Sequence, residues 1–174
     1  MPSDDYRKQY ATYFHETGHN LDFVIGKKLW VGYASGGYKS LTYNATFNQM
    51  IIDEGFEYIE KYRHIVSKKT GKTVIANEEV YREIWLDFKD EKIANKRQLS
   101  DILDDLTNGK MRKSGYNLGG SHTKQDEKYW DYHPVGREAF AHFTSILATN
   151  LKMKEMYIEM FPKSFEIYKE IIRQ

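Results

Sequence analysis

The chain has 174 residues and a mass of 20.6 kDa, which predicts a single domain over residues 1–174. Hydrophobic residues make up 40% of the chain, enough to form a buried core, so a largely disordered chain is excluded. The 26 Lys and Arg residues and the 25 Asp and Glu residues leave a net charge of +1, which argues against a nucleic-acid partner. The lack of cysteine excludes a disulfide scaffold, a thiolate zinc site and a cysteine nucleophile.

The distribution of apolar residues predicts neither a membrane span nor a leader peptide. No apolar run is long enough to cross a bilayer, and the opening MPSDDYRKQY lacks the apolar stretch of a signal peptide. We therefore expect no membrane partner, and the cytoplasm or a virion is favoured as the location unless the chain is a fragment of a longer protein.

Apolar positions with a 3.6-residue period predict a mainly α fold with at most a minimal β-sheet, so the class is α or α+β. The first helix is expected over 4–24, and a short strand or hairpin within the glycine- and aromatic-rich stretch 30–44. Residues 107–134 read as a long polar loop, and a loop of this length in a compact domain is usually functional. The remaining helices are expected over 45–67 with a break at Gly55, over 78–88, over 99–106 with Ser100 as its N-cap, over 135–149, and as a pair over 151–173 divided at Pro162.

The first predicted helix contains His15-Glu16-Thr17-Gly18-His19, which has the form HExxH. Two histidines at this spacing lie on one helical face, so both imidazoles can direct a nitrogen at the same metal ion. Glu16 lies one step round the helix and can take a proton from a water molecule at that ion. Gly18 inside a helix costs about 1 kcal/mol relative to alanine, which suggests that another backbone packs closely there. The alternative is a solvated helix face that carries the two histidines by coincidence.

A catalytic zinc site needs a third protein ligand. The residue types leave five candidates: Asp22, His122, His133, Glu138 and His142. Glu138 lies in the amphipathic stretch REAFAHF, among small and aromatic residues, so its carboxylate is expected to be partly buried and to need a partner. That partner is either a zinc ion or a neighbouring Arg or Lys side chain.

Two of these candidates are better suited to supporting a ligand. Asp22 follows His19 by three residues and shares its helical face, so its short side chain can hold a histidine ring in place. His142 follows Glu138 by four residues. Its role stays open between support of a ligand, a fourth ligand and an ordinary histidine of a helix.

The polar loop that precedes the Glu138 helix carries further candidates: His122, Tyr129 and Tyr132. A tyrosine hydroxyl or a protonated histidine near the metal can stabilise the oxyanion that forms when water attacks a peptide carbonyl. The alternative is that these side chains only attach the loop to the body of the protein.

The blocks HETGHNLD at 15–22 and REAFAHF at 137–143 resemble the HExGHxxD and ExFAxxF motifs of the anthrax lethal factor-like metallopeptidases. The resemblance implies a zincin-like helical domain in which the HExxH helix carries the active site. It also implies the gluzincin set of Zn²⁺ ligands, which here are His15, His19 and Glu138.

The same resemblance implies catalytic roles for other residues. Glu16 matches the general base of the family. A tyrosine a few residues before the last ligand assists catalysis in that group, which implies Tyr129 or Tyr132 here, although neither spacing matches.

A second resemblance is to the metallopeptidase-like C-terminal domains of phage minor head proteins and related prophage proteins. It rests on SDILDDLTNGK at 100–110, on His122 and Tyr129-Trp130 after a glycine-rich turn, and on EAFAHF at 138–143. It implies phage head proteins as partners or substrates and a place in the virion.

The chain departs from the gluzincin pattern in two ways. Only 14 residues precede His15, and none reads as the strands that normally come before the HExxH helix. The chain is then either a piece of a longer protein or a version whose sheet is reduced to 30–44. In addition, 118 residues separate His19 from Glu138, a long insertion for this scheme.

Three functions follow from these observations. The first is a zinc metallopeptidase that hydrolyses a peptide or protein substrate, in which Glu16 shuttles a proton from water to the leaving amine. The second is a structural or assembly module of a phage head that keeps the metal site without proteolysis. The third is a helical protein without a metal.

Overall fold

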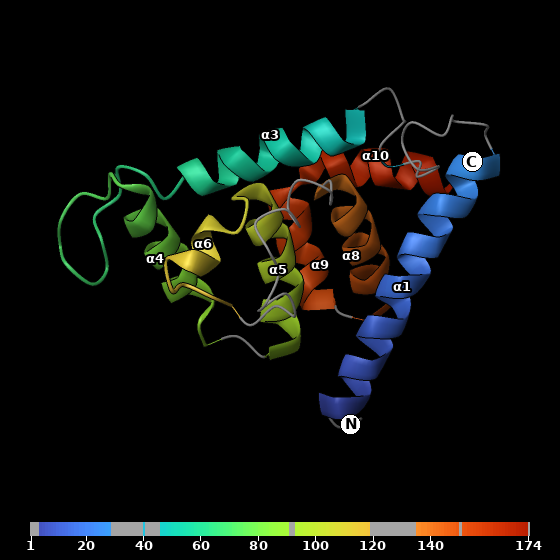
Figure 1. The fold of residues 1–174 in the computed structure, drawn as a ribbon, viewed down its shortest axis with the longest axis horizontal. Helices are drawn as coiled ribbons and strands as arrows, with labels where there is room; N and C mark the ends of the chain where they lie inside the picture. The colour runs from blue at the N-terminus through green and yellow to red at the C-terminus, as the bar shows by residue number, and fades with distance from the viewer. Residues whose placement is uncertain are drawn as a thin grey trace. The chain divides into compact units, whose positions relative to one another are not determined.

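The structure is a computed structural model that describes residues 4–28, 40, 46–90, 93–118, 135–149 and 151–173. Within these residues the chain forms helices and no β-sheet, which confirms the predicted mainly α fold. The strand or hairpin expected over 30–44 falls, except for Ser40, outside the described residues. The helices, shown in Figure 1, are α1 (Asp4–Lys28), α3 (Thr46–Glu60), α4 (Asn77–Phe88), α5 (Ile93–Leu106), α6 (Lys110–Lys113), α8 (Val135–Thr149), α9 (Leu151–Met160) and α10 (Pro162–Ile172).

The helix predicted over 45–67 is shorter and has no break. α3 continues through Gly55, where a Cβ atom would lie 2.4 Å from the side chain of Leu106, so the glycine serves close packing. The helix ends at Glu60, and His64, with a φ of 64°, turns the chain into a short hairpin closed by an isolated bridge between Val66 and Thr73. Turns over 61–64 follow the end of the helix, so the helix is shorter than the apolar periodicity predicted.

The helix predicted over 99–106 begins earlier, at Ile93. Ser100 is therefore not an N-cap, and its Oγ donates a hydrogen bond of 3.1 Å to the Asp104 carboxylate one turn later. The predicted end is confirmed, since α5 stops at Leu106 and both Asn108 and Gly109 have positive φ.

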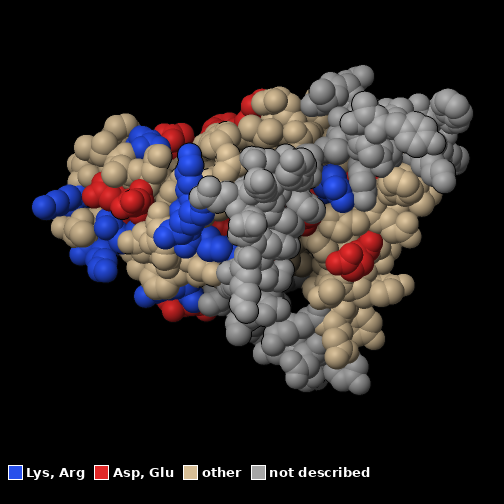
Figure 2. All heavy atoms as spheres, viewed as in Figure 1, with Lys and Arg blue, Asp and Glu red and all other residues tan. Residues whose placement is uncertain are grey.

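The contacts divide the chain into two compact units, one of Met1–Glu54 with His133–Gln174 and one of Gly55–Tyr132. In the second unit, Glu83 of α4 holds the hairpin. Its carboxylate accepts hydrogen bonds from Ser67 Oγ at 2.7 Å and from the backbone N–H of Lys68 at 3.1 Å. Figure 2 shows acidic and basic side chains close together over this unit.

In the first unit, α1 packs along α8. The approach is close because Gly18 has no side chain: a Cβ there would lie 2.7 Å from the Cα of Ala141. One turn along α8, Ser145 Oγ donates a 2.9 Å hydrogen bond to the backbone carbonyl of Ala11. These contacts fix the register of α1 against α8 and confirm the close backbone packing expected at Gly18.

The core of this unit lies on the other side of α8, around Phe143. Its ring centroid lies within 6.4 Å of five aromatic rings, those of Phe47, Tyr157, Phe161, Phe165 and Tyr168. α8 is therefore held between this aromatic core and α1. None of the helices in the described ranges has an apolar stretch long enough to cross a membrane.

Candidate metal centre

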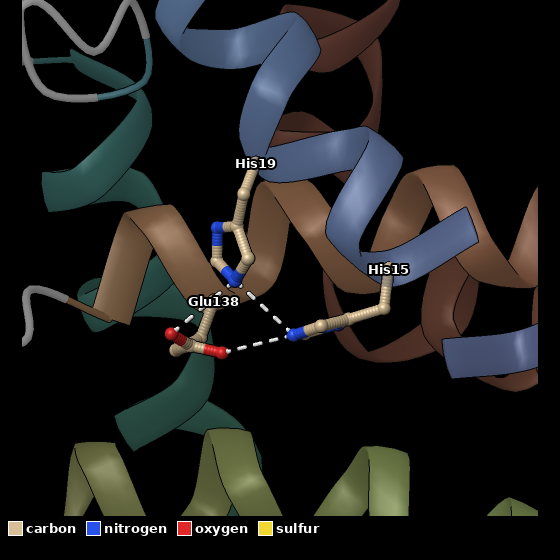
Figure 3. Close-up of side chains that lie close together, drawn as sticks. All are labelled: His15, His19 and Glu138. Atoms are coloured by element: carbon tan, nitrogen blue, oxygen red, sulfur yellow. Dashed lines mark hydrogen bonds and ion pairs between the residues drawn. The ribbon is translucent and has the colours of Figure 1, made fainter. Parts of the chain in front are cut away.

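α1 and α8 bring together His15, His19 and Glu138, the three residues expected to bind a metal. Figure 3 shows both imidazoles and the carboxylate pointing toward one another. The two Nε2 atoms are 3.1 Å apart. The Nε2 of His15 is 3.4 Å from one oxygen of Glu138, and the Nε2 of His19 is 3.5 Å from the other. One donor atom from each residue lies within 4.8 Å of the others, so the group can hold a metal ion.

The spacing of these atoms is informative. A charge-assisted hydrogen bond between a nitrogen and a carboxylate is about 2.7–2.9 Å long, so the contacts at 3.4 and 3.5 Å are long for hydrogen bonds. A tetrahedral ion with bonds of about 2.0–2.1 Å places its ligand atoms about 3.3–3.4 Å apart. The two nitrogen–oxygen distances are therefore close to those between ligands of one small ion.

The carboxylate of Glu138 is buried, with only 7% of the residue exposed. Burial alone would raise the pKa of Glu138, but the facing imidazoles of His15 and His19 and the charge on His19 and His142 outweigh burial and hold that pKa well below its usual range. Glu138 also lies in the first turn of α8, where the helix dipole favours a negative charge. The site is therefore a buried anion beside two nitrogen donors.

The position of Glu138 depends on a residue that sequence reasoning missed. The side chain of Asn48, on α3, accepts a hydrogen bond of 2.7 Å from the backbone N–H of Gly136, one of the first N–H groups of α8. A Cβ at Gly136 would lie 2.7 Å from the Asn48 side chain, so this contact requires glycine. The partners are 88 residues apart, and no local pattern links them.

Asp22 is bonded to the segment that follows α1. Its carboxylate, 0% exposed, accepts hydrogen bonds from the backbone N–H and the Oγ of Ser40, at 2.7 and 2.5 Å. The Nδ1 atoms of His15 and His19 are buried and have no hydrogen-bond partner within the described ranges. Asp22 thus ties Ser40 to α1, one turn beyond His19.

His142 lies beside the site and is not one of the grouped donors. Its ring centroid is 4.5 Å from that of His15, with 50° between the ring planes, and the residue is 3% exposed. Within the described chain the donor group contains His15, His19 and Glu138 only. His142 thus lies outside the donor group, with its ring against that of His15.

Glu16 is exposed to solvent on α1, adjacent in sequence to His15. Successive residues of a helix are 100° apart, which places Glu16 beside the ligand face and toward the solvent. The other expected residues of the site, His122, Tyr129, Tyr132 and the candidate ligand His133, lie outside the described residues.

Comparisons with protein-family models, with curated proteins and with solved structures gave no match. The assignment of this site therefore depends on its residues and their geometry.

Proposed function

We propose that the protein is a zinc-dependent metallopeptidase. The observation that carries the proposal is the convergence of two histidine nitrogens and a buried carboxylate at the ligand spacing of one small ion. Zn²⁺ is the metal that this set favours, since imidazole nitrogens suit it and three protein ligands leave one coordination position open for water. A purely structural zinc site would usually have four protein ligands.

The chain's own residues then have distinct tasks. His15, His19 and Glu138 would hold the ion, which would supply Lewis-acid chemistry by polarising a carbonyl and by making water easier to deprotonate. The Glu16 carboxylate accepts a proton from the attacking water while the oxygen of that water bonds to the peptide carbonyl carbon. Glu16 then gives this proton to the amine as the C–N bond breaks, so that it ends the cycle ionised.

The resemblance of 15–22 and 137–143 to lethal factor-like metallopeptidases supports a peptide or protein as the substrate. The likeness of 100–110 and 138–143 to phage minor head domains extends the proposal to a phage or prophage setting, with head proteins as substrates or partners. Both extensions depend on sequence likeness and not on the geometry of the site.

A second candidate is a phage head assembly module whose metal site does not cleave peptides. It is favoured by the lack of a β-sheet among the described residues, because the edge of a sheet is a common means of aligning an extended peptide. The two candidates share the metal site and differ only in hydrolysis, so one experiment separates them.

That experiment compares the zinc-loaded wild-type chain with Glu16→Gln. Hydrolysis of a mixed peptide library is followed by mass spectrometry, and zinc content is measured on the same samples. We expect peptide cleavage by the wild type, and a loss of about 10²–10⁴-fold in Glu16→Gln with zinc content unchanged. Cleavage that persists in Glu16→Gln would contradict the proposal. Zinc bound without cleavage of any peptide would favour the assembly module.

A further inference from the structure

We propose that His142 is a positioning residue of the metal site, whose ring fixes the orientation of the His15 imidazole. The proposal rests on the metal-binding function proposed above, and it assigns to His142 a task other than ligation. It is carried by the contact between the two rings and by the helix that His142 shares with Glu138.

Within the described part of the chain, two rings lie against the imidazole of His15. His19 lies against it with ring centroids 4.7 Å apart and planes at 86°, and His142 lies against it at 4.5 Å and 50°. Since His19 is itself a ligand on the same helix, it cannot serve as a fixed support. Of these two rings, that of His142 comes from the opposing helix, α8.

His142 can act as a fixed support because it is buried. Only 3% of the residue is exposed, so a change of rotamer would displace packed atoms. It lies one turn after Glu138 on α8, so the same rigid helix supplies both the third donor and the surface against which His15 rests. A shift of His142 relative to Glu138 would require α8 to deform.

The register between α1 and α8 completes the arrangement. The contact of Gly18 with Ala141 and the hydrogen bond from Ser145 to Ala11 set where His15 meets α8. With that register fixed, contact with the His142 ring holds the His15 imidazole in the orientation in which the Nε2 of His15 faces Glu138. Residues that orient a metal ligand typically change metal affinity by about 10–100-fold when they are mutated.

The test uses His142→Ala, which removes the ring, and His142→Phe, which keeps a ring and removes both nitrogens. Phe143→Leu is the matched control, because it removes a buried ring from the next position of α8, on the side of the aromatic core. Zn²⁺ affinity is measured by competition with a chromophoric chelator. The visible spectrum of the Co²⁺-loaded chain reports the coordination geometry, which a general loss of stability would not alter.

We expect His142→Ala to weaken zinc binding about 10–100-fold and to change the Co²⁺ spectrum. We expect His142→Phe to keep affinity and spectrum close to those of the wild type, and Phe143→Leu to lower the melting temperature with little change in affinity. If the alanine variant does not fold, His142→Gln replaces it, since it also lacks a ring.

Two results would overturn the role of His142 alone. Equal weakening in the alanine and phenylalanine variants would show that a nitrogen of His142 is required, as for a ligand. Unchanged affinity in all variants would show that the ring does not position His15. A wild-type chain that binds neither metal would overturn the proposed function together with this inference.

Discussion

Two glutamates of the same unit, Glu138 on α8 and Glu54 on α3, are buried to nearly the same degree, with 7% and 6% of each residue exposed. The oxygens of Glu54 accept hydrogen bonds from Lys163 N, Ser164 N and Ser164 Oγ, at 2.8, 3.0 and 2.6 Å. Among the described residues, the partners of the Glu138 oxygens are imidazole nitrogens, at 3.4 and 3.5 Å. One carboxylate is fully bonded, and the other is surrounded by donors at the spacing of metal ligands.

The difference shows how to tell a structural carboxylate from a ligand. Glu54 supplies the cap of α10, a helix whose own N-cap residue, Phe161, makes no side-chain cap bond. Glu138 caps nothing in the described chain, and its nitrogen partners offer lone pairs as readily as protons. Both residues are glutamates in amphipathic helices, so their neighbours in space, and not in sequence, separate the two roles.

The largest expected effect comes from removing Glu138. In the wild type, zinc should raise the free energy of unfolding, by about 4 kcal/mol when free zinc is 1,000 times its dissociation constant. Glu138→Ala should lose nearly all of this zinc-linked stabilisation, because one of three ligands is gone. Urea unfolding of both chains, once with zinc and once with a chelator, measures this zinc-linked stabilisation. A variant that zinc still stabilises as much as the wild type would mean that Glu138 is not a ligand.

Removing Glu54 should have a smaller effect of a different kind. Glu54→Ala leaves two backbone N–H groups of α10 and a buried hydroxyl without their acceptor, which we expect to cost about 2–3 kcal/mol of unfolding free energy. Zinc affinity should stay within a few-fold of the wild type. Glu57→Ala, an exposed position on the same helix, is the control and should change stability by less than about 0.5 kcal/mol. A loss of zinc in Glu54→Ala would remove the contrast between the two glutamates.

Gly18→Ala should have an intermediate effect on both the free energy of unfolding and the zinc affinity. The added Cβ would lie 2.7 Å from the Cα of Ala141, so α1 and α8 must separate. We expect a net destabilisation of about 1–2 kcal/mol, since overpacking outweighs the better helix propensity of alanine. Zinc affinity should fall with it, because the donors lie on the two helices. Asn20→Ala, exposed on α1, is the control, and equal behaviour of both variants would contradict the close packing.

The smallest effect concerns Glu83 of the other unit, a third buried carboxylate. Burial alone would raise the pKa of Glu83, but hydrogen bonds from Ser67, Lys68 and Arg82 outweigh it and hold the pKa below the ordinary value of 4.5. The folded state therefore binds fewer protons than the unfolded state, so this stabilisation is present above pH 4.5 and is lost as the pH falls through the folded pKa. Between pH 6 and pH 3, the melting temperature should fall less steeply for Glu83→Gln than for the wild type. The same dependence of melting temperature on pH in both chains would show that Glu83 forms its hydrogen bonds equally well when it is protonated.

The parts of the site that depend on local sequence were predictable. The HExxH spacing and the amphipathic stretch REAFAHF led to His15, His19 and Glu138, and α8 has the predicted bounds, Val135–Thr149. The helical class and the glycine contact at Gly18 followed from periodicity and propensity.

The parts that depend on distant residues were not predictable. The partner of Asp22 is Ser40, and the start of α8 is held by Asn48, 88 residues from Gly136 in the sequence. Ser100 resembles an N-cap by composition, yet it bonds Asp104 inside a longer helix because α5 begins at Ile93. Such contacts arise from tertiary packing, which overrides local preference.

The most direct test of the account is a zinc titration of the purified chain and its Glu138→Ala and Glu54→Ala variants, with bound metal counted per chain. We predict one zinc per wild-type chain, one in Glu54→Ala, and an affinity lowered by more than about 100-fold in Glu138→Ala, beyond what the loss of a supporting residue causes. Tight zinc binding by Glu138→Ala, or none by the wild type, would contradict the claim that His15, His19 and Glu138 form a metal centre.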